Sequence, residues 1–275
     1  MSHCRACTLL IFTWMSLGCL SLQHASASSA NTVAQTPSDA TYMIDGRAFT
    51  LDKGRVTMDV FPGAASKTVI EVSGEPVSGD LDRDGMPDAA LLLVETTGGS
   101  GTFYHVVAAF KRDDSFVGTR AILLGDRIVP QQLSIRHGIV IVDYLDRRPG
   151  EAMATAPSQN VSQYLAAREG RLEEIPLAEN QVIAAGEVVI GDEVRSFRPC
   201  GAGDAAWLIG ASPALPAMQA SYHLNMSDAS PYAPLFMVLT GQPVDRPAEG
   251  FGVDYPAGFY ATRLVHSLPG ASCSP

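Results

Sequence analysis

The sequence predicts a mainly β protein: an N-terminal antiparallel β-sandwich or barrel, followed by a second, smaller β domain with one helix. Short runs of β-branched and aromatic residues alternate with Gly, Asp and Pro, and dense strands with short turns are typical of antiparallel sandwiches and barrels. A Pro- and Ala-containing stretch at 176–185 separates two sets of such runs. One segment, 213–226, repeats apolar residues at helical spacing, which predicts a single helix.

Residues 1–27 have the features of a cleavable signal peptide. Arg5 is their only charged residue, an apolar run spans 8–22, and the small residues Ala25 and Ala27 form an A-x-A site. The run is short for a membrane span, which needs about 20 apolar residues, although a retained signal anchor is an alternative. Cleavage after Ala27 predicts a periplasmic or secreted protein.

A lipid anchor at Cys19 is a second alternative. Ser16-Leu17-Gly18-Cys19 resembles the bacterial lipobox, but Ser16 stands where that motif usually has Leu. Lipidation would make the chain an envelope lipoprotein, and we expect membrane attachment only in that case.

The remaining chain divides into segments by composition. Residues 28–40 are small and polar and predict a flexible linker. Residues 41–176 form the N-terminal β domain, 177–185 a second linker and 186–275 the C-terminal domain. The predicted strands of the first domain cover 41–44, 48–51, 55–60, 68–72, 89–96, 103–111, 119–124, 132–135, 139–145, 162–168 and 172–175. Those of the second cover 187–190, 193–197, 206–210, 235–241 and 258–267.

An Asp-rich loop at 79–88 is the sharpest local motif. Its spacing matches the first part of an EF-hand-like loop, with carboxylates at alternate positions and a glycine that permits a tight bend. Hard divalent cations such as calcium bind six or more oxygens, so we expect a calcium site. The predicted ligands are the side chains of Asp80, Asp82, Asp84 and Asp88 and the backbone carbonyl of Met86.

The loop departs from a true EF-hand, because a strand is predicted after it and Leu91 stands where the final Glu belongs. It looks more like the short calcium loops of FG-GAP-type repeats, which run into a strand. The alternative is a β-turn without an ion, in which the Asp side chains accept hydrogen bonds from backbone amides.

Five cysteines are present, and cleavage after Ala27 would remove three of them. The two that remain, Cys200 and Cys273, form an even count in an oxidising compartment, so a disulfide is predicted between them.

The C-terminal third resembles the OB-fold domain of the NlpE-like envelope lipoproteins. The resemblance rests on Ser196-Phe197-x-x-Cys200-Gly201, the helix ending near Tyr222, the strand at 234–241 and Cys273. It implies a small OB-like β-barrel with one helix. That family's N-terminal Cys-x-x-Cys motif, which is implicated in copper sensing, has no match in 41–176, so copper sensing is not implied. The N-terminal region itself resembles an uncharacterised bacterial envelope domain with an FG-GAP-like Asp loop.

The charge balance and the motifs restrict the classes of function that the sequence supports. Acidic residues outnumber basic ones, 29 to 19, and no Lys/Arg cluster occurs, so nucleic acid is not expected as a partner. Gly98–Thr102 lacks the Lys-Ser/Thr end of a phosphate-binding loop. Ser100 with His105 is a weak candidate for a catalytic pair.

The leading hypothesis is therefore a non-enzymatic envelope protein with a binding or stress-response accessory role. Calcium would stabilise it, and an envelope protein or glycan would be its partner. The alternative is a hydrolase of envelope polymers that uses carboxylates such as Asp143 and Asp146.

Overall fold

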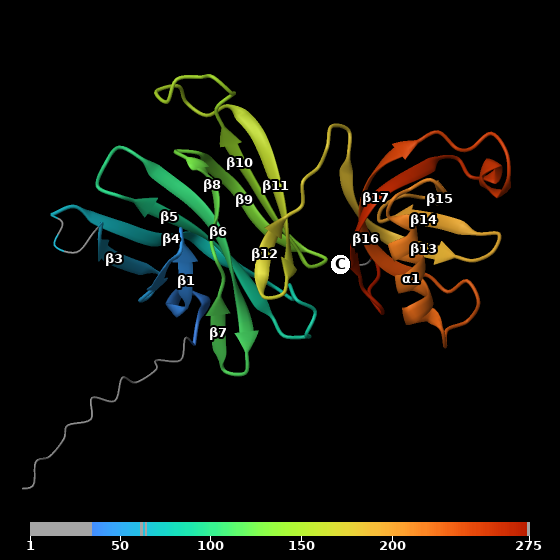
Figure 1. Cartoon of the computed structure of the whole chain (residues 1–275), viewed down its shortest axis with the longest axis horizontal. Helices are drawn as coiled ribbons and strands as arrows, with labels where there is room; N and C mark the ends of the chain where they lie inside the picture. Colours follow the sequence, from blue (N-terminus) through green and yellow to red (C-terminus); the bar gives the residue numbers. More distant parts are fainter. Residues whose placement is uncertain (1–34, 61–62, 64, 274–275) are drawn as a thin grey trace, which may run out of the picture. The chain divides into compact units, whose positions relative to one another are not determined.

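The computed structural model describes residues 35–60, 63 and 65–273. The predicted signal peptide, Cys19 and residues 28–34 of the predicted linker lie outside this range. The predicted fold class is confirmed: the chain is mainly β, with several sheets, a five-stranded barrel and one α-helix (Figure 1). No helix among the described residues is long and apolar enough to cross a membrane.

A sandwich of two antiparallel sheets forms the N-terminal region. One sheet has the order β3-β4-β5-β6-β7, with β8 also paired to β6, and the other has the order β12-β11-β10-β9. The strands of the first sheet are β3 (Arg55–Asp59), β4 (Lys67–Gly79), β5 (Asp88–Thr96), β6 (Thr102–Arg112), β7 (Ser115–Gly118) and β8 (Ile122–Asp126). Those of the second are β9 (Val129–Arg136), β10 (Ile139–Asp146), β11 (Gln159–Arg168) and β12 (Arg171–Glu174).

The facing sides of the two sheets share one apolar core. Leu92 and Val106 from the first sheet pack with Val140, Val142 and Leu165 from the second. Alternate residues of a strand point to opposite faces, so the neighbouring residues of β5 and β6 face away from this core.

A short hairpin covers that opposite face. It consists of β1 (Thr41–Ile44) and β2 (Arg47–Thr50), whose Tyr42 and Phe49 pack against Leu91, Leu93 and Val107. Both faces of β5 and β6 are therefore buried. This explains why residues 89–94 form an unbroken apolar run instead of alternating with polar residues.

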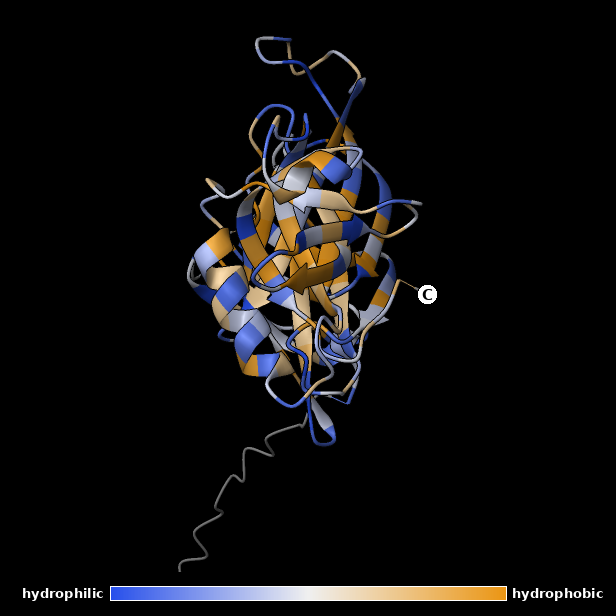
Figure 2. Ribbon diagram, turned by 90° about the vertical axis from the view of Figure 1, so that its right-hand side faces the viewer, coloured by the Kyte–Doolittle hydropathy of each residue, from blue (hydrophilic) through white to orange (hydrophobic). Residues whose placement is uncertain are grey.

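The C-terminal region is a closed barrel with the order β13-β14-β15-β17-β16. Its strands are β13 (Val182–Ile190), β14 (Arg195–Pro199), β15 (Ala206–Leu208), β16 (Leu235–Val244) and β17 (Gly258–Ser267). Helix α1 (Leu215–Met226) connects β15 to β16 in the chain and packs Met218 and Tyr222 into the barrel core. Apolar residues gather in the barrel strands and polar ones in the loops (Figure 2).

A further apolar cluster joins the barrel to the outer face of the four-stranded sheet. Ile139 and Ala166 of that sheet lie with Phe236 and Val238 of β16. His137 stacks on Phe236 with ring centroids 4.9 Å apart. A disulfide joins Cys200 to Cys273, with 5.1 Å between the Cα atoms, as the cysteine count predicts.

Several elements differ from those expected; for example, β13 begins at Val182 and not at 187. β4 continues past the expected end at 72, through a bulge between Ser73 and Val77, to Gly79. The strand expected at 119–124 begins only at Ile122, as β8, because Thr119 and Ala121 bond to Met43 of β1; β7, at 115–118, was not expected. Pro37–Asp39, in the predicted linker, form a 3-10 turn to which the Tyr42 hydroxyl donates.

Candidate functional site

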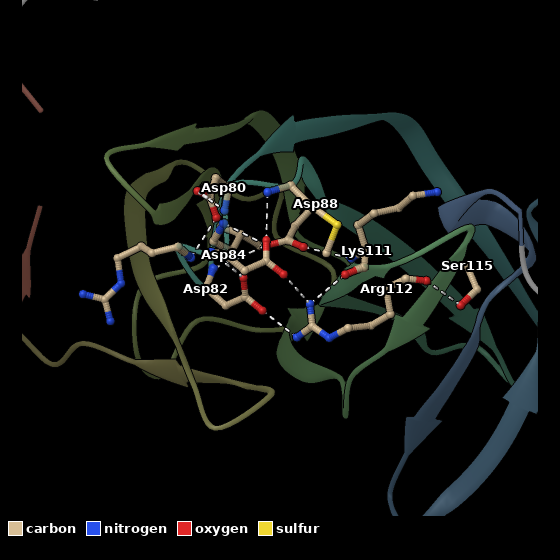
Figure 3. Close-up of polar contacts among 11 residues, drawn as sticks. Asp80, Asp82, Asp84, Asp88, Lys111, Arg112 and Ser115 are labelled. Atoms are coloured by element: carbon tan, nitrogen blue, oxygen red, sulfur yellow. Dashed lines mark hydrogen bonds and ion pairs between the residues drawn. The ribbon is translucent and has the colours of Figure 1, made fainter. Parts of the chain in front are cut away.

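The Asp-rich loop connects the end of β4 to the start of β5 (Figure 3). Its carboxylates turn inward and accept hydrogen bonds from the loop's own backbone. Asp80 accepts from the amides of Arg83 at 2.7 Å and Gly85 at 3.2 Å. Gly85 has a positive φ of 86°, which glycine adopts without steric cost.

Asp88 is the fully buried member of the loop. Its Oδ2 accepts from the amide of Leu81 at 2.8 Å, and its Oδ1 accepts from the amide of Lys111 at 2.9 Å. Asp88 thus ties the loop to the end of β6. Burial raises the pKa of Asp88 above its ordinary value, although the backbone amides favour the charged carboxylate and partly oppose the rise.

Three of the predicted ligands converge. One carboxylate oxygen each from Asp80, Asp82 and Asp88 lies within 4.8 Å of the others. Two oxygens bound to one calcium ion at 2.3–2.6 Å can be up to roughly 5 Å apart. The spacing of the three side chains therefore fits one such ion.

Asp84 lies outside this group. Its Oδ1 accepts from the amide of Met86 at 2.8 Å, and its Oδ2 accepts from Arg112 Nη1 at 3.0 Å. Arg112 also pairs with Asp82. One guanidinium group thus holds two of the loop's carboxylates from the end of β6, as Figure 3 shows.

The sequence did not point to Arg112. The signal that would have found it is the pairing of β5 with β6, in which Ala89 lies opposite Ala109. In that register, Lys111 and Arg112, which follow Phe110 in β6, lie beside the loop that precedes Ala89. The register depends on tertiary packing and is not evident from the charge pattern alone.

The weaker catalytic candidates are placed as follows. His105 Nε2 lies 3.1 Å from a carboxylate oxygen of Glu95 on the neighbouring strand. Ser100 lies in the turn before β6. Asp143 and Asp146 are three residues apart on β10, so their side chains face opposite sides of the sheet.

Comparison with known proteins gives little further information. No protein-family model matches the chain, and no curated protein matches it. A solved structure, the crystal structure of the Cpx pathway activator NlpE from Escherichia coli, aligns with a TM-score of 0.28 and 12% identity. The alignment covers 80% of this chain and 96% of that chain. It concerns the arrangement of strands alone, and at this TM-score no argument about function rests on it.

Proposed function

We propose that this chain is a non-enzymatic accessory or binding protein of the bacterial envelope, and that its Asp-rich loop binds one calcium ion as a structural brace. The convergence of Asp80, Asp82 and Asp88 is the observation that carries the calcium assignment. The export features of residues 1–27 and the disulfide support the envelope assignment.

A structural role for the ion follows from what the carboxylates already do. Asp80 and Asp88 hold backbone amides in place, and Asp88 bonds to both the loop and β6. An ion bound by them would fasten the connection between β4 and β5, which are central strands of the larger sheet. Calcium would supply positive charge to carboxylates that Arg112 neutralises only in part.

Thermal unfolding tests the calcium assignment. The melting temperature should fall when EDTA is added and recover with calcium but not with zinc. At a calcium concentration 100 times the Kd, the expected stabilisation is about 2.7 kcal/mol. Asp82→Asn should abolish the response. Asp114→Asn, an exposed carboxylate in the turn after β6, is the matched control and should retain it.

An equal melting temperature in EDTA and in calcium would contradict the assignment, and would favour Arg112 as the loop's sole counter-ion. The same holds if Asp114→Asn removes the response as fully as Asp82→Asn does.

The envelope assignment is tested by cell fractionation and mass spectrometry of the mature protein. Cleavage after Ala27 predicts a mature chain that begins at Ser28. An acylated N-terminal Cys19 would instead establish the lipoprotein. A full-length chain confined to the cytoplasm would contradict export. Affinity capture from envelope extracts, with glycans included, then addresses the proposed partner.

A further inference from the structure

His266 on β17 is the most unusual buried polar residue among those described. It is only 3% exposed, and neither ring nitrogen has a hydrogen-bond partner in the described structure. Nearly all buried polar groups in proteins are hydrogen-bonded, and leaving one unsatisfied costs about 1–3 kcal/mol. An imidazole with two unsatisfied nitrogens therefore indicates a group that awaits a ligand.

His266 lines a cavity of about 390 Å³, which is large enough for a small molecule. The cavity wall also includes Arg83 from the Asp-rich loop and Arg168 from the end of β11. Charged side chains thus approach His266 from two other elements.

The carboxylates of this wall are already paired. Asp82 pairs with Arg112, Glu169 with Arg171 at 3.3 Å, and Glu173 with Arg168 at 3.9 Å. Arg83 is the remaining cationic side chain of the wall that takes part in none of these pairs.

Arg83 differs from these residues. Among the described residues its guanidinium has no carboxylate within 4.0 Å and donates only to the carbonyl of Ser267, at 3.3 Å. A guanidinium carries five N–H donors in a planar fork that matches a carboxylate or a phosphate. Most of its donor capacity is unused here.

The electrostatics at the ring favour an anion over a metal ion. Burial, together with the nearby charges of Arg83 and Arg168, lowers the pKa of His266 to about 4. The backbone of Gly138, which approaches without hydrogen-bonding geometry, partly opposes this. The ring is thus neutral near pH 7 and offers one N–H donor. His266 also belongs to no cluster of three metal-ligating side chains in the described part of the chain.

We propose that this cavity binds a small ligand through an oxyanion, a carboxylate or a phosphate, which lies between the guanidinium of Arg83 and the imidazole of His266. The oxyanion would accept from the guanidinium and from the one N–H of the buried ring. The cavity shares Asp82 with the proposed calcium site, but the oxyanion contacts Arg83 and His266 and does not require the calcium ion.

The test is a titration of the full mature chain with inorganic phosphate and, separately, with acetate. It is done at pH 7.5, at constant ionic strength and in EDTA, and the ring nitrogens of the histidines are followed by NMR. The His266 signals should shift saturably with one or both anions, while those of His223, on the barrel's helix, should not. Saturation by phosphate alone or by acetate alone identifies the oxyanion preferred.

Variants identify the contacts. Arg83→Asn should weaken binding at least tenfold, and Asn tolerates the left-handed backbone of this position, where φ is 67°. Arg263→Gln, which removes an exposed guanidinium of β17 outside the cavity wall and its ion pairs, is the control and should bind as wild type does. If Arg83→Asn does not fold, Arg83→Lys keeps the charge without the fork and should also weaken binding.

Shifts at His266 that rise linearly without saturation would overturn the proposal. So would shifts that match those of His223, or binding that Arg83→Asn and Arg83→Lys leave unchanged. Because EDTA is present throughout, failure of the calcium assignment would leave this result intact, and the reverse also holds.

Discussion

At the scale of single residues, the hydrogen bonds of Asp88 contribute most to the structure of the Asp-rich loop. Its two oxygens accept from the amide of Leu81, at the start of the connection between β4 and β5, and from the amide of Lys111 on β6. Asp88→Asn replaces one acceptor with an N–H donor that faces a backbone amide. We expect a loss of about 1–3 kcal/mol in unfolding free energy, measured by denaturant unfolding.

Asp114→Asn serves as the control for this measurement, because Asp114 is exposed and has no such bonds in the described structure. Equal stability of Asp88→Asn and wild type would show that the amides are satisfied without this carboxylate.

His266 predicts a pH dependence of stability. Its pKa is about 4 in the folded chain and about 6.5 when unfolded. Between these values the unfolded state binds the proton and the folded state does not, so stability falls as the pH drops from about 6.5 towards 4. The full effect is about 3 kcal/mol. Unfolding of His266→Phe, measured at pH 7 and pH 4.5, should show a smaller loss than wild type. An identical loss would contradict the assignment.

Sequence reasoning found the carboxylates of the Asp-rich loop but missed Arg112 and the His266 cavity. The carboxylates share one short segment whose spacing is itself informative. Arg112 meets them only because β6 pairs with β5, and Arg83 and His266 line one cavity although they are 183 positions apart in the chain. Contacts of that range depend on packing that no local pattern encodes.

At the scale of elements, the barrel depends on a close approach between β13 and β14. A Cβ atom at Gly186 would lie 2.2 Å from the carbonyl oxygen of Arg198 on the paired strand. Gly186→Ala must therefore displace backbone, and we expect a destabilisation of about 1–3 kcal/mol. Gly203→Ala is the control, because its Cβ would meet no atom within 4 Å. Calorimetric melting of both variants tests this, and equal melting temperatures would contradict it.

The disulfide fastens the end of the chain to β14. It joins residues 73 positions apart, so chain-entropy reasoning gives a stabilisation of about 4 kcal/mol. Replacing both cysteines with serine should lower the unfolding free energy by about that amount in denaturant titrations. Mass spectrometry of the exported protein should find the wild-type pair oxidised, and two free thiols would contradict the assignment.

The predicted limits of a strand agree best with the structure where one continuous apolar segment forms a single strand. β17 begins and ends as expected, at Gly258 and Ser267. β4 was predicted too short, since Gly74 and Pro76 favour a turn, yet the strand accommodates them in a bulge. β7 was missed and β8 was predicted to begin too early, because the segment between them bonds to β1, which lies far away in the sequence.

At the scale of the described chain, residues 35–60, 63 and 65–273, each sheet face buries against a neighbour. The hairpin covers one face of the larger sheet, the two sheets cover each other, and the barrel covers the outer face of the smaller one. The Asp-rich loop lies at an end of the larger sheet, and Arg83 within it donates to Ser267 of the barrel. Ions or ligands bound there would therefore act on contacts that link the barrel to the sandwich.

Isothermal titration calorimetry with calcium tests the central claim, a structural ion in the Asp-rich loop, most directly. The mature chain, stripped with EDTA and dialysed, should bind one calcium ion per chain. Asp80→Asn and Asp82→Asn should each weaken binding at least tenfold, whereas Asp114→Asn should bind as wild type does. An absence of saturable binding in wild type, or binding that both loop variants retain in full, would contradict the claim.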